Sequence, residues 1–197
     1  DVERSRGLGD VYKRQGLFSM MKMFPVIIAL IFTPILVKKT GSMQKVNFWG
    51  YVISDILGIF LIIFAMQKNL PMMLLFMFLK GTFAGTMSGT LNALIAEISG
   101  YTYRTKGVHI DGMMFSCSSL GVKVGGGIGT AAVGWLLHAA GYAGKAATQT
   151  AAATNMIFSM YITIPVILGV VITILLGLMK VEKENKRIDM ERAEQAD

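Results

Sequence analysis

The chain has 197 residues, of which 53% are hydrophobic and 16% charged, and its net charge is +7. Soluble domains carry about 25% charged residues, so this composition and its long apolar runs indicate a membrane protein. The basic residues lie in short runs between apolar segments, which argues against a nucleic-acid-binding protein. The single cysteine, Cys117, excludes an internal disulfide, and His109 and His138 lie on different segments, so the sequence predicts no metal site.

Residues 1–15 differ from the rest of the chain. Within them Asp10–Gln15 resembles one translated frame of the transposon-end adaptor used to make sequencing libraries, and no apolar period is present. We expect that residues 1–15 are not native, that 16–182 form part of a transmembrane domain and that 183–197 form a charged cytoplasmic tail. A native cytosolic arm is the alternative for the first fifteen residues, and an uninterrupted native reading frame through those codons would support it.

Five apolar segments are long enough to cross about 30 Å of hydrocarbon. They cover about residues 17–37, 46–66, 71–98, 112–140 and 156–179. Pro25 and Pro34 lie in the first, and membrane helices tolerate proline. The sequence therefore predicts an all-α fold, a polytopic membrane helical bundle with five transmembrane helices. The tail from Lys180 alternates acids and bases, which predicts a solvated helix.

The distribution of lysine and arginine predicts the orientation. Alternate connections on one side hold ten basic residues, whereas the other side holds only Lys22, Lys68 and Lys145. The positive-inside rule then places the C-terminus in the cytoplasm. We expect a multi-pass protein of the inner (cytoplasmic) membrane.

Two ionisable residues fall near the middle of predicted spans. Lys123 is about eleven residues into the fourth span, or ~16 Å deep, and Asp55 is ~12 Å deep in the second. A cation at this depth costs roughly 2.5–3.5 kcal/mol and usually faces a bundle interior or a watery cavity. Asp55 has two readings that stay open: a direct role, or a structural partner of Lys80 or Lys123.

Three of the predicted helices each carry one polar face. Residues at spacings of three or four share a face. The fourth helix has Ser116, Ser119, Lys123, Gly127, Thr130 and Gly134, the third has Gly81, Gly85, Ser88 and Asn92, and the second has Tyr51, Asp55 and Gly58. Together they can enclose a small hydrophilic cavity, although for glycines such as Gly121 and Gly125 close helix packing is the commoner role.

The stretch from residue 96 to 112, AEISGYTYRTKGVHIDG, is followed by GVKVGG at 121–126, VGWLL at 133–137 and Gly141-Tyr142. This pattern resembles the C-terminal half of the glycoside–pentoside–hexuronide:cation symporters, the melibiose-permease-like branch of the major facilitator superfamily. The resemblance covers residues 16–182 and implies spans eight to twelve of a twelve-span fold.

The resemblance also implies roles for single residues. Lys123 matches a lysine that lines the sugar and cation cavity, and we expect Asn92, Ser119, Thr130 and Asp55 to join it in binding substrate. A second group is expected to form the charge network of the inner gate: Glu97, Arg104, His109, which stands where the family usually has arginine, and Asp111, which replaces a glutamate.

The implied function is secondary active transport of a sugar with a cation by alternating access, in which this chain is a fragment. No catalytic residue, enzyme activity or cofactor is expected. The coupling cation, Na⁺ or H⁺, would be bound mainly by an N-terminal half that is absent here. The expected partners are a small sugar, membrane lipid and that missing half, with no nucleic acid.

Three alternatives stay open. The same fold can carry an amphipathic lipid or drug, or the chain can be a non-transporting membrane remnant. The third is a membrane-embedded enzyme such as a lipid-headgroup transferase, which would need acids clustered near one interface, whereas the acids here are scattered.

Overall fold

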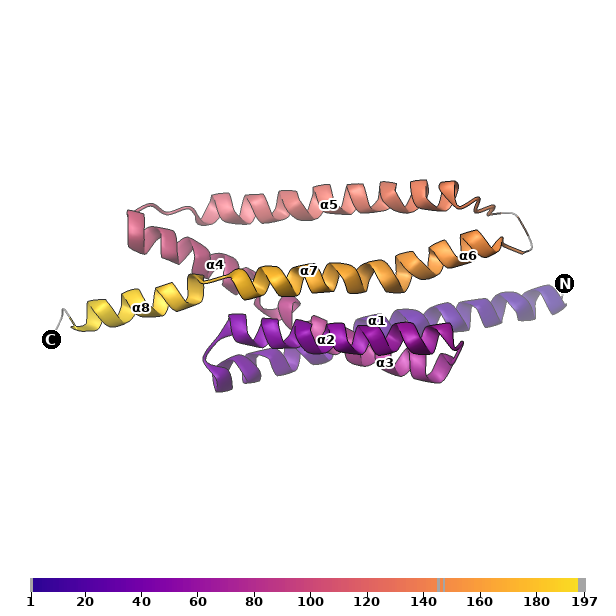
Figure 1. The fold of residues 1–197 in the computed structure, drawn as a ribbon, viewed down its shortest axis with the longest axis horizontal. Coiled ribbons are helices and arrows are strands. Elements are labelled where there is room, and N and C mark those ends of the chain that lie inside the picture. The colour runs from indigo at the N-terminus through magenta and orange to yellow at the C-terminus, as the bar shows by residue number, and fades with distance from the viewer. Residues whose placement is uncertain (1, 145, 147, 195–197) are drawn as a thin grey trace. The chain divides into compact units, whose positions relative to one another are not determined.

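The computed structural model describes residues 2–144, 146 and 148–194, and within them it contains helices and no strand (Figure 1). Lys145 of the topology prediction lies outside these residues, as do residue 1 and the side chains of residues 2–15, 17, 18, 192 and 193. The elements in chain order are α1 (Val2–Thr40), α2 (Met43–Met66), α3 (Leu70–Ala84), α4 (Thr86–Lys106), α5 (Asp111–Ala139), α6 (Ala151–Phe158), the π-helical segment η1 (Ser159–Thr163), α7 (Ile164–Leu178) and α8 (Val181–Glu194).

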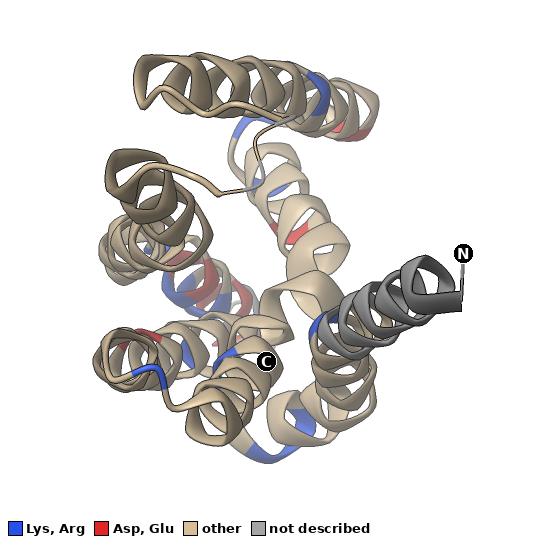
Figure 2. Ribbon diagram, turned by 90° about the vertical axis from the view of Figure 1, so that its right-hand side faces the viewer, with Lys and Arg blue, Asp and Glu red and all other residues tan. Residues whose placement is uncertain are grey.

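Five helical stretches of the described residues are long and apolar enough to cross a membrane, which confirms the predicted all-α class and number of spans. They are Ser19–Thr40, Met43–Met66, Leu70–Lys106, Asp111–Ala139 and Ala151–Glu191. Large apolar side chains along them face outward; Ile31, Trp135 and Leu178 are 60%, 74% and 69% exposed. Little of the ribbon carries acids or bases (Figure 2). In a bilayer such outward side chains contact acyl chains, so their exposure needs no covering protein.

The third span is longer than predicted and is broken once. Its two helices, α3 and α4, meet at Gly85, and the stretch from Leu70 to Lys106 has 37 residues. At 1.5 Å per residue that is ~55 Å, well beyond the hydrocarbon thickness of about 30 Å. Residues 96–106, expected mostly as a connection, are therefore helical, and only Gly107–Ile110 join α4 to α5. Gly107 has a φ of +69°, which suits glycine at the end of a helix.

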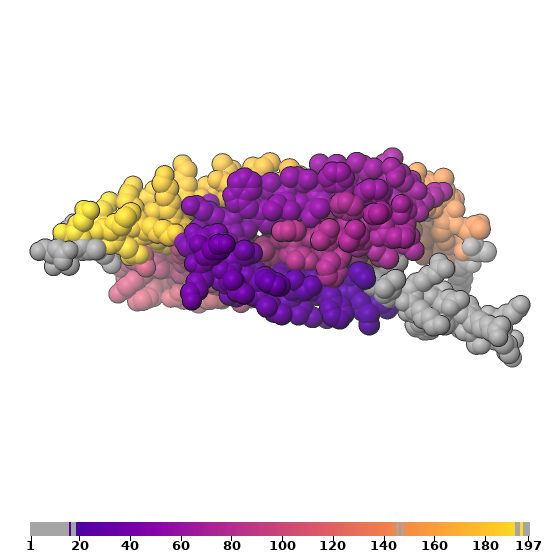
Figure 3. Space-filling view, turned by 90° about the horizontal axis from the view of Figure 1, so that it is seen from below, coloured from indigo at the N-terminus to yellow at the C-terminus, as the bar shows by residue number. Residues whose placement is uncertain are grey.

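The first of two compact units covers residues 1–90 and is built from α1, α2, α3 and the first turn of α4. Figure 3 shows the side chains of these helices packed against one another. Small residues allow the close approach: a Cβ on Gly85 would lie 2.7 Å from the Cβ of Ala29, and one on Gly50 would lie 2.7 Å from Oγ1 of Thr86. Small residues at such interfaces are typical of membrane helix pairs.

Buried polar side chains also join the helices of this unit. Nδ2 of Asn47, which is fully buried, donates to Oγ1 of Thr90 at 2.7 Å. The Ser54 hydroxyl donates to the Lys80 carbonyl at 3.2 Å. These bonds connect α2 to α3 and α4 along one seam, and interhelical bonds of this kind stabilise membrane bundles modestly.

The second unit covers residues 91–197. The C-terminal end of α5 packs on α6 and η1, where Val133 and Leu137 face Ile157 and Met160 across a cavity of about 290 Å³. The π-helical turn precedes Pro165, whose missing N–H and bulky ring prevent regular i→i−4 bonding and so favour a shifted register. The charged tail forms α8, so its predicted helix is confirmed.

Candidate functional site

The polar face of α5 is uncovered within its own unit. None of the described residues of α5 is buried, and Ser119, Lys123 and Thr130 are all exposed. The Thr130 hydroxyl donates to the Gly126 carbonyl at 2.9 Å, which leaves its oxygen lone pairs available as acceptors. A helix that crosses the hydrocarbon with an ammonium at mid-length needs water or protein against that face.

The glycines of α5 support the same conclusion. No atom of the described residues lies within 4 Å of a Cβ built on Gly121, Gly125, Gly127 or Gly129. No described residue therefore packs closely against them, and close packing, the commoner role of such glycines, stays a prediction. Their effect here is to keep the surface of α5 flat around Lys123.

Asn92, the predicted substrate ligand of the third span, is an exposed residue of α4. Within the described part of the second unit, no hydrogen bond or ion pair joins it to Ser119 or Lys123. The structure thus displays these predicted ligands on two helices without bringing them into contact.

Asp55 belongs to the first unit, and its surroundings favour the reading as a structural partner. One of its carboxylate oxygens is buried, and the carboxylate interacts electrostatically with the Lys80 ammonium and the Tyr51 hydroxyl. The backbone carbonyl of Lys80 also accepts a hydrogen bond from Ser54 of α2. Opposite charges on α2 and α3 therefore compensate each other inside the helix pair.

A second cluster of charges forms where the end of α4 meets α8. Nδ2 of Asn185 donates to the Glu97 carbonyl at 3.1 Å, and Nη1 of Arg104 donates to Oδ2 of Asp189 at 2.8 Å. Glu182 is only 6% exposed, and its carboxylate pairs with Nζ of Lys186 at 3.0 Å. Glu97 interacts electrostatically with Glu182, Lys186 and Arg104. We call these residues of α4 and α8 the α4–α8 cluster.

The predicted gate network is divided by this arrangement. Glu97 and Arg104 belong to the α4–α8 cluster, whereas His109 and Asp111 lie at the turn before α5. There Nδ1 of His109 is 3.8 Å from Oδ2 of Asp111, both side chains are exposed, and the imidazole stacks on Tyr103 at 4.0 Å. Among the described residues, no group of three or more His, Cys, Asp or Glu could hold a metal ion.

Sequence reasoning missed the part that α8 plays. Asn185 and Glu182 are buried, but the alternating charges of the tail were interpreted as a fully solvated face. One signal was available: an asparagine amid charged residues can donate to a carbonyl of a neighbouring helix.

Comparisons with known proteins give a family match and several relatives. The family described as "MFS/sugar transport protein" matches residues 8–183. The isoprimeverose transporter of Lactiplantibacillus pentosus is 28% identical over 157 residues, which cover 80% of this chain and 32% of the relative. The putative glycoside/cation symporter YagG of Escherichia coli (strain K12) is 28% identical over 109 residues, 53% of this chain and 24% of the relative.

A third relative, the "uncharacterized 29.9 kDa protein in crtE 3'region" of Pseudescherichia vulneris, is 27% identical over 132 residues, or 66% of this chain and 48% of the relative. The chain thus spans less than half the length of each of these three relatives. No solved structure matches the chain.

Proposed function

Because the chain belongs to the MFS/sugar transport protein family, we propose that it is part of a secondary transporter that carries a glycoside or related sugar together with Na⁺ or H⁺. The expected mechanism is alternating access, in which two helical bundles rock around a site near the bilayer midplane. The names of two relatives, an isoprimeverose transporter and a putative glycoside/cation symporter, support both the solute and the coupling.

The observation that carries the proposal is the uncovered polar face of α5. It presents Lys123, Ser119 and Thr130 along one line, at a depth where hydrocarbon would oppose them. A water-filled cavity removes that cost, and a sugar in it meets both donors and acceptors. Lys123 donates to sugar oxygens or, as a fixed charge, balances acids across the cavity.

Asn92 would complete the sugar site from α4, since an amide can donate to one hydroxyl and accept from another. Asp55 would not contact the sugar directly. It would contribute to the site by balancing the charge of Lys80 within the pair of helices α2 and α3. The cation itself would bind mainly to helices outside the five described here, with this part of the protein supplying sugar contacts.

The α4–α8 cluster would form the inner gate. The excess of lysine and arginine in alternate connections puts this end of α4, α8 and the C-terminus in the cytoplasm, with the spans in the inner membrane. Arg104 and Asp189 are partly exposed, so their ion pair can open at modest cost when the cavity opens inward.

Uptake measurements on the full-length transporter test the proposal. Lys123→Ala should abolish cation-stimulated sugar accumulation while the protein is still expressed and inserted. Lys68→Gln, which removes an exposed cation at the far end of α2, is the matched control and should leave uptake unchanged. Normal cation-stimulated accumulation by the Lys123 variant would contradict the role given to α5.

A further inference from the structure

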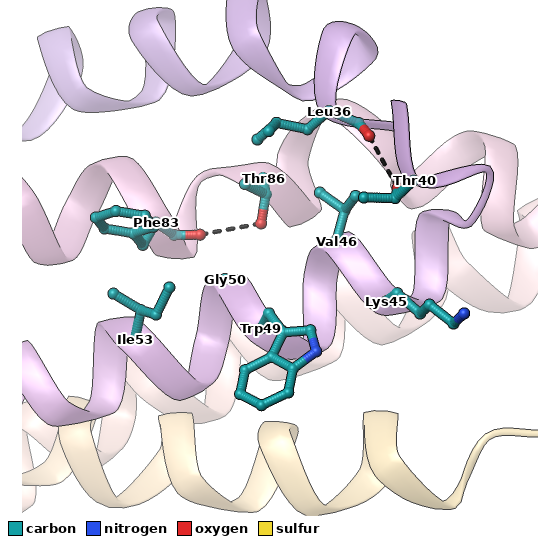
Figure 4. Close-up of a pocket in the computed structure, with 9 residues that line it drawn as sticks. All are labelled: Leu36, Thr40, Lys45, Val46, Trp49, Gly50, Ile53, Phe83 and Thr86. Atoms are coloured by element: carbon teal, nitrogen blue, oxygen red, sulfur yellow. Dashed lines mark hydrogen bonds between the residues drawn. The ribbon is translucent and has the colours of Figure 1, made fainter. Parts of the chain in front are cut away.

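An apolar groove lies in the first unit, whereas the polar face of α5 belongs to the second. It has a volume of about 350 Å³ and opens between the end of α1, the first half of α2 and the junction of α3 and α4 (Figure 4). Leu36, Ile53 and Phe83 form much of its wall. The volume is at the lower end of the roughly 300–1,000 Å³ typical of small-molecule sites.

The two threonine hydroxyls of the wall are already engaged. The Thr40 hydroxyl donates to the Leu36 carbonyl at 2.8 Å, and the Thr86 hydroxyl donates to the Phe83 carbonyl at 2.9 Å (Figure 4). Neither hydroxyl has a hydrogen left to offer a ligand. The groove therefore suits a hydrocarbon chain and is a poor site for a sugar.

Along one edge of the groove the side chains change from charged to apolar with increasing depth. Lys45, Trp49 and Ile53 follow one another at intervals of four residues and so lie on one side of α2, each about 6 Å deeper than the last. Lys45 stands at the rim with its ammonium turned outward, and Trp49 is 60% exposed (Figure 4). Tryptophan is enriched at the headgroup level of membranes, where its ring is apolar and its N–H is polar.

The rim is also strongly basic. Lys38 and Lys39 end α1, Lys45 lies in the first turn of α2, and the sequence has no acid between residues 16 and 54. Basic pockets between membrane helices are known binding sites for anionic headgroups. An ammonium group at the rim of an apolar groove, with two more lysines in the adjacent last turn of α1, complements a molecule with a negative head and a hydrocarbon tail.

We propose that this groove binds an anionic phospholipid, with one acyl chain against Leu36, Ile53 and Phe83 and the phosphate at Lys45, supported by Lys38 and Lys39. None of the residues that line the groove belongs to the proposed sugar-binding set, and the site does not depend on which solute is carried. It would fix the end of α1 to α2 in the plane of the headgroups.

Native mass spectrometry of the 197-residue chain in detergent tests this proposal. Phosphatidylglycerol, phosphatidylcholine and inorganic phosphate are titrated separately, and phosphatidylglycerol should bind most tightly. Lys45→Gln should weaken phosphatidylglycerol about fivefold, the change expected for one lysine near an anionic surface, and should leave phosphatidylcholine unchanged. The control Lys68→Gln should alter neither.

A second variant addresses the acyl chain. Ile53→Trp fills the groove from a side chain that is already 37% exposed, so the helices can accept it, and circular dichroism checks that they persist. Both lipids should then bind more weakly. Equal affinity for the two lipids, equal effects of the two lysine variants, or displacement of lipid by inorganic phosphate would overturn the proposal. Lipid binding that is insensitive to Ile53→Trp would also overturn the proposal, because the acyl chain would then lie outside the groove.

Discussion

The buried bond between Asn47 and Thr90 gives a prediction whose size follows from the structure. Asn47 is fully buried and Thr90 is 3% exposed, and the Nδ2–Oγ1 distance is 2.7 Å. The Thr90 hydroxyl also donates to the Thr86 carbonyl at 3.2 Å, so it both accepts and donates. We consider Asn47→Ala, Thr90→Val and the double variant.

The coupling energy of the pair should be about 1 kcal/mol. Neutral hydrogen bonds contribute roughly 0.5–1.5 kcal/mol in water-soluble proteins, and interhelical bonds in membranes average about 0.6 with a maximum near 1.7. In the part of the chain that the structure describes, Oδ1 of Asn47 is buried without a partner. The Asn47→Ala variant therefore mixes the lost bond with relief of that cost and with a cavity, whereas Thr90→Val leaves Nδ2 of Asn47 without its acceptor. Only the double-mutant cycle isolates the bond.

The assay is reversible unfolding of the chain in mixed micelles, followed by helicity, with free energies of unfolding for all four proteins. Thr82→Val is the control partner, because the Thr82 hydroxyl donates to the Phe78 carbonyl of its own helix at 3.1 Å. Coupling between Asn47→Ala and Thr82→Val should be within about 0.3–0.5 kcal/mol of zero. If the Asn47–Thr90 coupling is equally small, the polar seam does not join α2 to α4.

Two further predictions concern the helix contacts. Gly85→Ala should be less stable than Gly125→Ala by about 1–3 kcal/mol in the same unfolding assay, because its Cβ would lie 2.7 Å from that of Ala29 while Gly125 has no described atom within 4 Å. The backbone of Gly85 has φ −64° and ψ −16°, which alanine adopts without strain, so equal stability would refute the close approach. Asn185→Ala should accelerate hydrogen exchange of the α8 amides about fivefold, which corresponds to the loss of a buried hydrogen bond worth ~1 kcal/mol. Arg104→Gln should accelerate exchange less, because the ion pair that it removes is exposed. The reverse order would show that the ion pair holds α8.

The long apolar runs were enough to predict the five spans, since hydrocarbon thickness constrains their length directly. The break at Gly85 was not predictable from the sequence, because a glycine inside a helical pattern has several roles and only the proximity of Ala29 selects one. The extension of α4 to Lys106 was missed for a related reason. Its last turns are polar, and hydropathy detects the part of a helix within the membrane but not the part that continues beyond it.

The candidate site was predictable in part. Spacing placed Ser119, Lys123 and Thr130 on one helix, α5, where the structure leaves all three exposed, and their role in binding stays a prediction. The residues that lie opposite them are determined by contacts between segments far apart in the sequence. The periodicity of a single helix gives no information about such contacts. The same limit applies to α8, where charge alternation predicted a helix but did not predict that Asn185 would reach the Glu97 carbonyl.

Thiol labelling of α5 in the full-length transporter, in native membranes, tests the central claim most directly. Single cysteines replace Ser119, Lys123, Thr130 or Ile128 in a background with Cys117→Ser, and a membrane-impermeant maleimide reports which positions meet water. Ile128 is about 140° around the helix from Lys123, so it serves as the lipid-facing control. We predict rapid labelling at 119, 123 and 130, slowed by the transported glycoside, and little at 128. Labelling of position 128 as fast as the other three, or none at any of them, would contradict a hydrated sugar pathway along α5.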